Sequence, residues 1–395
     1  VAVSGAGVAA INKIATDVKA YIEGSGIDAG SVALSATDTS VIEADGGAAA
    51  VSAAFGFVGV AVSVGVAVAV NQINNDIAAY INNFASPSLI VITRGSGAIS
   101  VEATDNATIT ARTAAAAVSA AAGFVGIAVS GSGAAATNLI FTKTNAYVTG
   151  SVLDSAGDVT IKAQDTSTIN ALVISAAASL GGGLVGISGS IGTSIARNLI
   201  GWQLDLNVTA DYTTAAVRSF IFNGETVKIE EGVRAGDIYE YIGSSPLFPD
   251  FANGETVLKL GNQDYANIDL WKQINLVEAP VEVQAYVSNS QIDAAGAMLV
   301  EATANETINA SVLAGSVAVS AGLIAGASSA AGASVENTVA TKVKAFIENT
   351  TGTGVNVVGN ITLTAQDTST ITVLAGASSV AKAVGLVADS VSIGI

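Results

Sequence analysis

The chain has 395 residues, of which 50% are hydrophobic, 5% aromatic and 12% charged. Its formal net charge of −17 disfavours nucleic acid, whose phosphates require clustered Lys and Arg. It contains no His and no Cys, which excludes His-based triads, thiol catalysis, disulfides and the usual zinc sites, and we expect no enzyme.

The first segment, residues 1–30, matches the second half of a unit that recurs along the chain. Val1–Gly7 resembles Ile127–Gly133, and Asn12 and Tyr21 match Asn138 and Tyr147. Further units begin at about residues 31, 98 and 158, and again at about 297 and 360, where the last one is truncated. We therefore expect two repeat regions, 1–201 and 280–395, belonging to a longer array.

Three residue types recur at fixed offsets within these units. The motif Ala-x-Asp-x-Ser/Thr-x-Ile places the residues Asp38, Asp105, Asp165, Ala304 and Asp367 at its third position. A glycine follows each of them at Gly56, Gly123, Gly183, Gly322 and Gly385, and an asparagine recurs at Asn12, Asn71, Asn138, Asn198 and Asn337. Recurrence at about 60 to 67 residues is typical of a repeat protein.

Period-two alternation dominates each unit. Val60–Val70 alternates Val with small residues, and Val159–Ala163 alternates apolar with polar residues. This period indicates strands. Because one unit cannot bury both of its faces, the sequence predicts an all-β, parallel β-helix-like solenoid. The Ala/Gly/Ser face of Val60–Val70 suits either an internal sheet-to-sheet contact or a surface between chains.

The segment Ala48–Val70 has no charged residue and is long enough to span a bilayer as a helix. Its period of two and its Val content argue against a helix. The matching segments 175–193 and 316–334 also carry Ser and Gly freely. We therefore expect strands here and no membrane insertion.

The recurring polar residues allow two interpretations each. Stacked Asn side chains can bond to one another in a ladder, or each Asn can occupy an ordinary turn. The aspartates Asp38, Asp105, Asp165 and Asp367 could bind calcium through stacked carboxylates, or cap turns. The glycine-rich calcium nonapeptide is missing and Ala304 interrupts the series, so turn capping is favoured and no cofactor is expected.

Residues 202–279 interrupt the spacing and differ in composition. They hold both Trp and the pairs Asn223-Gly224 and Gly236-Asp237, typical of turns between short strands. We expect a small β module here. Its aromatic residues Tyr239, Tyr241 and Trp271 either contact a glycan or form the core of the module.

The motif, the small-residue stretch and the Asn step resemble repeats of giant bacterial surface proteins and leukotoxin-like filamentous adhesins. This resemblance covers about four fifths of the chain and implies an extracellular, cell-surface location. The interrupting segment more distantly resembles a small carbohydrate-binding module, through Gly236, Asp237, Tyr239, Tyr241, Gly243 and Trp271. That resemblance implies sugar contact through exposed rings.

Two functions are therefore predicted. The first is a non-catalytic structural or adhesive fibre, whose partners are further repeats or copies of itself. The alternative is a glycan-binding surface protein, in which residues 202–279 contact a polysaccharide and the repeats present them.

Overall fold

The computed structural model describes residues 1–85, 88–204, 208–230, 237–249, 251, 255–263, 265, 270–278 and 280–395. They form two compact units. The main unit comprises Val1–Gly201 and Pro280–Ile395, and the inserted module comprises Trp202–Ala279. The described residues are predominantly β-strand and contain no helix that is long and apolar enough to cross a membrane. Ala48–Val70 lies within a strand, as expected.

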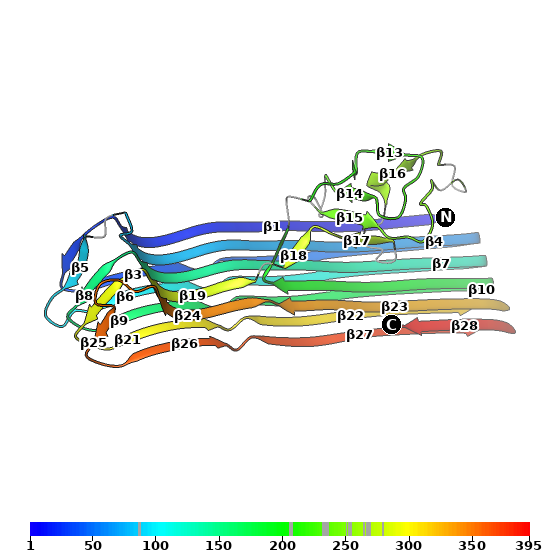
Figure 1. Cartoon of the computed structure of the whole chain (residues 1–395). Helices are drawn as coiled ribbons and strands as arrows, with labels where there is room; N and C mark the ends of the chain where they lie inside the picture. Colours follow the sequence, from blue (N-terminus) through cyan, green and yellow to red (C-terminus); the bar gives the residue numbers. More distant parts are fainter. Residues whose placement is uncertain are drawn as a thin grey trace. The chain divides into compact units, whose positions relative to one another are not determined.

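The main unit contains one large parallel sheet in which equivalent strands of successive units lie side by side (Figure 1). Its principal order is β1 (Ala2–Glu23), β4 (Val41–Asn82), β7 (Thr108–Thr149), β10 (Thr168–Ile200), β22 (Thr307–Ala321) and β27 (Thr370–Val384). The same sheet includes β19 (Val281–Ser288), β23 (Ile324–Val339), β24 (Thr341–Glu348) and β28 (Val387–Gly394).

Two smaller parallel sheets repeat this order with short strands. One contains β2 (Ile27–Ala29), β5 (Ile90–Thr93), β8 (Val152–Ser155), β20 (Gln291–Ala294) and β25 (Val355–Val357). The other contains β3 (Val32–Asp38), β6 (Ile99–Asp105), β9 (Val159–Asp165), β21 (Met298–Ala304) and β26 (Ile361–Asp367). In all three sheets the register aligns equivalent positions, such as Asn71 with Asn138.

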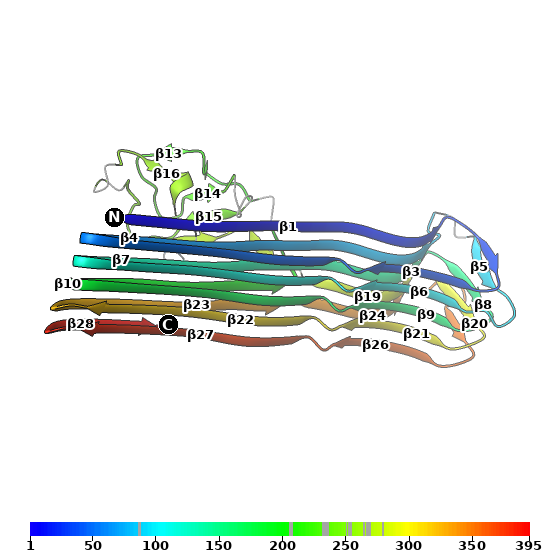
Figure 2. The same ribbon diagram turned by 180° about the vertical axis from the view of Figure 1, so that it is seen from behind.

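The long strands fold back on themselves at the recurring glycine. Side chains equidistant from that turn therefore meet, as in the hydrogen bond of 3.0 Å from Ser194 to Ser175 and that of 2.9 Å from Ser329 to Ser316. β4, β7 and β10 run through the turn without a break, whereas β22 and β23 are separate strands (Figure 2). We call this folded-over part the arm; it comprises residues 46–70, 113–137, 173–197, 312–336 and 375–395.

The two layers of the arm are packed closely through small side chains. Ala61, Ala67 and Ala69 are buried between them, and a Cβ added to Gly65 would lie 2.4 Å from the carbonyl oxygen of Ala116. The Ala/Gly/Ser face of Val60–Val70 is thus the internal contact between sheets. The alternating valines point outward instead, and Val64 and Val66 are exposed.

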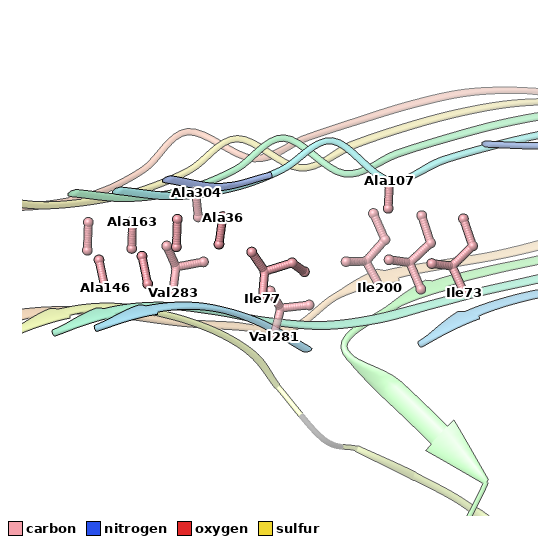
Figure 3. Packing of buried hydrophobic residues seen from close by; sticks show 14 of the residues in the cluster. Ala36, Ile73, Ile77, Ala107, Ala146, Ala163, Ile200, Val281, Val283 and Ala304 are labelled. Atoms are coloured by element: carbon pink, nitrogen blue, oxygen red, sulfur yellow. The ribbon is translucent and has the colours of Figure 1, made fainter. Parts of the chain in front are cut away.

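Beyond the arm, the space between the layers is filled by larger residues (Figure 3). Ile73 and Ile77 are fully buried there; Ile73 lies on the layer opposite Ala107, and Ala146 and Val283 lie opposite the alanines Ala36 and Ala163 of the short strands. This part of the main unit is a hydrophobic core in the ordinary sense, whereas the arm is held by close contact of small residues.

The inserted module interrupts one strand of the large sheet. β10 ends at Ile200, and β19 resumes pairing with β7 at Glu282 opposite Lys143. The module contains the pairs β11 (Trp202–Leu204) with β18 (Leu276–Glu278) and β13 (Val217–Arg218) with β16 (Leu258–Lys259), followed by η2 (Leu260–Asn262). A small sheet has the order β12 (Tyr212–Thr213), β14 (Thr226–Lys228), β15 (Ile238–Tyr241) and β17 (Trp271–Gln273).

Candidate functional site: side chains stacked between units

The recurring asparagines form a continuous ladder of amides. Each Nδ2 donates to the Oδ1 of the next unit's Asn, at distances of 2.8 Å for Asn12 to Asn71, 2.8 Å for Asn71 to Asn138, 2.7 Å for Asn138 to Asn198, and 2.7 Å for Asn198 to Asn337. The three central members are fully buried. Of the two interpretations from the sequence, the structure has the ladder, because only stacking in register satisfies these buried amides.

Replacing Asn138 by Ala is expected to lower the free energy of unfolding by roughly 2 to 4 kcal/mol, because a buried donor on Asn71 and a buried acceptor on Asn198 both lose their partner. Urea unfolding followed by circular dichroism measures this. The matched control is Asn309→Ala, which removes a similar bond of 3.0 Å to Asn170 on the exposed face. Equal losses in the two variants would contradict a special role for the buried ladder.

Aromatic rings form a second ladder along the same strands. Tyr21, Tyr80, Tyr147, Tyr286 and Phe346 are stacked face to face, with centroid distances of 5.1, 4.9, 5.0 and 4.8 Å between successive rings. Each such pair adds about 0.5 to 1.5 kcal/mol beyond area burial. The ladder crosses the insertion, since Tyr286 follows the module and still lies next to Tyr147.

Three of the four recurring aspartates, Asp38, Asp165 and Asp367, cap turns. In the unit of Asp38, its Oδ2 accepts a hydrogen bond of 2.9 Å from the backbone N–H of Ser40. Asp165 and Asp367 accept equivalent bonds of 2.8 Å from Ser167 and Ser369. This is the turn-capping interpretation, in which the carboxylate satisfies a backbone donor two residues later.

These caps also bring the carboxyl groups into one buried column. Asp38, Asp105 and Asp165 occupy paired positions on β3, β6 and β9. Burial raises the pKa of Asp105 to about 9, with repulsion from Asp165 and Asp38 adding to the effect. Burial likewise raises the pKa of Asp165. The column is therefore protonated in part at neutral pH.

The column continues through the unit that lacks the aspartate. Two residues after Ala304, at the position of Ser40 and Ser167, stands Glu306, which is fully buried and accepts a hydrogen bond from Ser369. Burial and the charge of Asp165 raise the pKa of Glu306 to about 8. Glu306 was not among the residues expected from the sequence; the available signal was a carboxylate displaced by two positions in the one unit without Asp.

No calcium site is formed by these groups in the described residues, where no three acidic side chains converge on a possible metal position. The carboxyl groups instead receive hydrogen bonds from hydroxyl and amide donors, such as the Asn75 amide on Asp38 at 2.7 Å and the Thr142 hydroxyl on Asp165 at 2.5 Å. In the described residues these carboxyl groups thus act as acceptors that link the short strands to the return strands.

The recurring glycines lie at the turn of the arm. A Cβ would come within 1.9 to 2.5 Å of the carbonyl oxygen in the preceding unit at Gly123, Gly183, Gly322 and Gly385. Gly56 has a φ of 152° and Gly183 one of 151°, values that residues with a side chain rarely adopt. Glycine is thus required for the backbone conformation at Gly56 and Gly183, and for the close stacking of units at the other positions and at Gly183.

Comparison with known proteins gives no family: no family model, no curated protein and no solved structure matches the chain. The interpretation of its function therefore depends on its own geometry.

The aromatic residues predicted to contact a glycan are buried in the core of the module. Tyr241 and Trp271 are only 2% and 3% exposed and their rings meet edge to face, and Tyr239 packs against the buried Tyr265. Sugar stacking requires an open ring face, so the prediction for these three residues is wrong and the alternative, a module core, describes them. Asp237 lies beside them with Tyr239 donating to it at 3.2 Å, and Gly236 lies outside the described residues.

Proposed function

We propose that this chain is a segment of an extracellular structural or adhesive fibre, built as a flattened β-solenoid whose units stack along one axis. The supporting observation is the register itself: equivalent residues of successive units are paired across three parallel sheets, and their amides and rings form ladders. In such an array each unit contacts only its neighbours, so length is set by the number of units.

The ladders favour a mechanical role over a catalytic one. The Asn ladder is buried in its central units and the ring ladder stacks aromatic side chains along the strands, so both resist separation of units and present no reactive group to solvent. The resemblance to surface adhesins adds the location, at the outside of a cell.

Immunogold electron microscopy of the organism that makes the protein tests this proposal. Antibodies against the main unit are expected to label fibres on the surface of intact cells. Label confined to the interior of sectioned cells, with intact cells unlabelled, would reject the extracellular fibre. Antibodies against an unrelated cytoplasmic protein provide the control for cell integrity.

A second candidate, glycan binding by the module, is favoured by a different set of rings from those predicted. Phe220, Phe222 and Phe248 are 37%, 50% and 53% exposed and lie close together, with the ring of Phe220 4.9 Å from that of Phe222 and 6.0 Å from that of Phe248. Retention of the full chain on a polysaccharide array, lost in Phe248→Ala, would support it. Absence of binding to every polysaccharide would remove it and leave the fibre unaffected.

A further inference from the structure

One outward surface of the arm carries no polar side chain over four successive units. We call it the outer face: the outward positions of β4 from Gly47 to Phe55, with the paired positions of β7, β10 and β22. Every one of these positions is Ala, Val, Ile, Leu, Phe or Gly. Val51 is 68% exposed and Leu180 52% exposed, so the larger side chains of this face project into solvent.

The inward side of the same strands is the more polar one. Ser52, Ser119 and Ser316 are buried between the layers, whereas Val51, Val118 and Val317 face outward from the adjacent positions. In water this arrangement forfeits about 25 cal/mol for each Å² of apolar surface left exposed. Parallel sheets are almost always covered on both faces, and a contiguous apolar patch of this kind marks an interaction site.

We propose that the outer face docks against the same face of a second copy of this chain, joining two columns laterally. The proposal deepens the structural function proposed above and rests on it. It specifies the surface by which one stacked column recognises another, and the partner's chemistry, which is an equally flat and uncharged parallel sheet.

The area of the outer face fits a stable pair. Four units at about 4.8 Å spacing and nine residues at about 3.3 Å rise cover roughly 600 Å². Two copies then bury roughly 1,200 Å², which reaches the lower limit for a specific, stable interface.

Charge also favours a copy of the same chain. The net charge of −17 lies away from this face, which begins beyond the pair of Asp45 and Arg112, 3.4 Å apart. Two copies therefore do not repel each other here, and a charged partner finds no complementary group. The apolar character ends at the fifth unit, where Lys382 is paired with Val319.

The relief of the face is complementary to itself. Val51, Val118 and Val317 form a ridge along the stacking direction that is interrupted by Ala178 of β10, and Ala49, Ala116, Ala176 and Gly315 form a shallow column beside it. A second copy turned to face the first and shifted by one such column places ridge in groove. Lateral packing of this type gives the dry, interdigitated contact found between stacked sheets.

Analytical ultracentrifugation of the full chain from 1 to 100 µM tests the proposal. The unmodified chain is expected to associate, and Val118→Lys to raise the dissociation constant at least tenfold, because it places a charge at the centre of the interface. Val217→Lys is the matched control: Val217 is a 53% exposed valine on β13 of the inserted module, and its replacement is expected to leave association unchanged. Ala116→Lys repeats the test at the neighbouring column, and circular dichroism verifies that each variant is folded.

Three outcomes would overturn the proposal. The chain could be monomeric at 100 µM, or its association could be unchanged in both Val118→Lys and Ala116→Lys. In the third, the monomer floats with phosphatidylcholine vesicles and the Val118→Lys variant does not. The last result would assign the face to lipid. Each is distinguishable from failure of the fibre proposal, because cell-surface labelling by immunogold does not depend on residue 118.

Discussion

Raising the pH from 5 to 8 is expected to lower the free energy of unfolding of the main unit by several kcal/mol. The carboxyl groups of Asp105 and Glu306 have pKa values raised to about 9 and about 8 in the folded chain, mainly because they are buried. The unfolded chain releases these protons near pH 4, whereas the folded chain retains them. Stability therefore falls with rising pH, by about 1.4 kcal/mol per pH unit for each retained proton, until the folded pKa is passed.

The groups around the column determine that stability falls, and does not rise, with increasing pH. Asp38 and Asp165 face Asp105 from the neighbouring strands, and the return strands face the column with uncharged donors such as Asn75 and Thr142. At the last unit, partial burial raises the pKa of Asp367, but hydrogen bonds from Ser369 and Thr341 outweigh it and the pKa is lowered. That group loses its stabilising contribution only at acid pH, below the window of the other two.

Urea unfolding at each pH measures the slope, and Asp105→Asn tests its origin. The amide has the shape of the protonated acid and cannot ionise. The free energy of unfolding of the variant is therefore expected to depend less on pH, by the contribution of about one proton. At pH 8 the variant is expected to be more stable than the unmodified chain. Asp154→Asn, the same substitution on the exposed side of β8, is the matched control. A stability that rises with pH over this range would contradict the protonated column.

The sequence is enough to predict that the units stack in register, but not which face of each strand is buried. Period two and fixed offsets are enough to predict strands and register, because identical residues at identical spacings align when units stack. They do not say which face of a strand is buried. In β4 the large apolar residues occupy even positions from Val58 to Val70 and odd positions from Ile73 to Ile81, so the parity changes at Asn71.

The parity changes because the space between the layers differs between the arm and the region beyond Asn71. Between the layers of the arm, backbones approach so closely that only Ala, Ser and Gly fit, as at Gly65, and valine is displaced to the outside. Beyond Asn71 the layers separate and isoleucines such as Ile73 fill the space. Assigning every large apolar residue to the core would therefore be wrong for the arm, because the space available between the layers, and not hydrophobicity alone, determines which side chains are buried.

For the aromatic residues of the module, the sequence pattern does not distinguish core residues from ligand-binding residues. Turn signals and composition are enough to locate a compact β segment, but a ring in an alternating strand is equally compatible with a core or a ligand surface. Tyr239 and Tyr241 lie two positions apart on β15 and are both buried, since other rings of the module cover each of them. The exposed phenylalanines lie mainly in loops, where period-two reasoning gives no indication of burial.

Replacing Gly183 by Ala is expected to destabilise the main unit by roughly 3 kcal/mol or more. The new Cβ would lie 2.1 Å from the carbonyl oxygen of Gly123, a backbone atom that cannot rotate away, and the φ of 151° adds conformational strain. Relief requires the two units to separate at the turn, which lengthens the hydrogen bonds between β7 and β10 along the arm.

Gly189→Ala on the same strand is the matched control for this substitution. A Cβ at Gly189 meets nothing within 4 Å, so the change is expected to be neutral or to stabilise the chain by about 0.5 to 1 kcal/mol through the lower entropy of the unfolded state. Urea unfolding of both variants gives the comparison. Similar stabilities for the two would mean that the turn of the arm is loose, and that the close approach of successive units at this glycine does not hold the stack together.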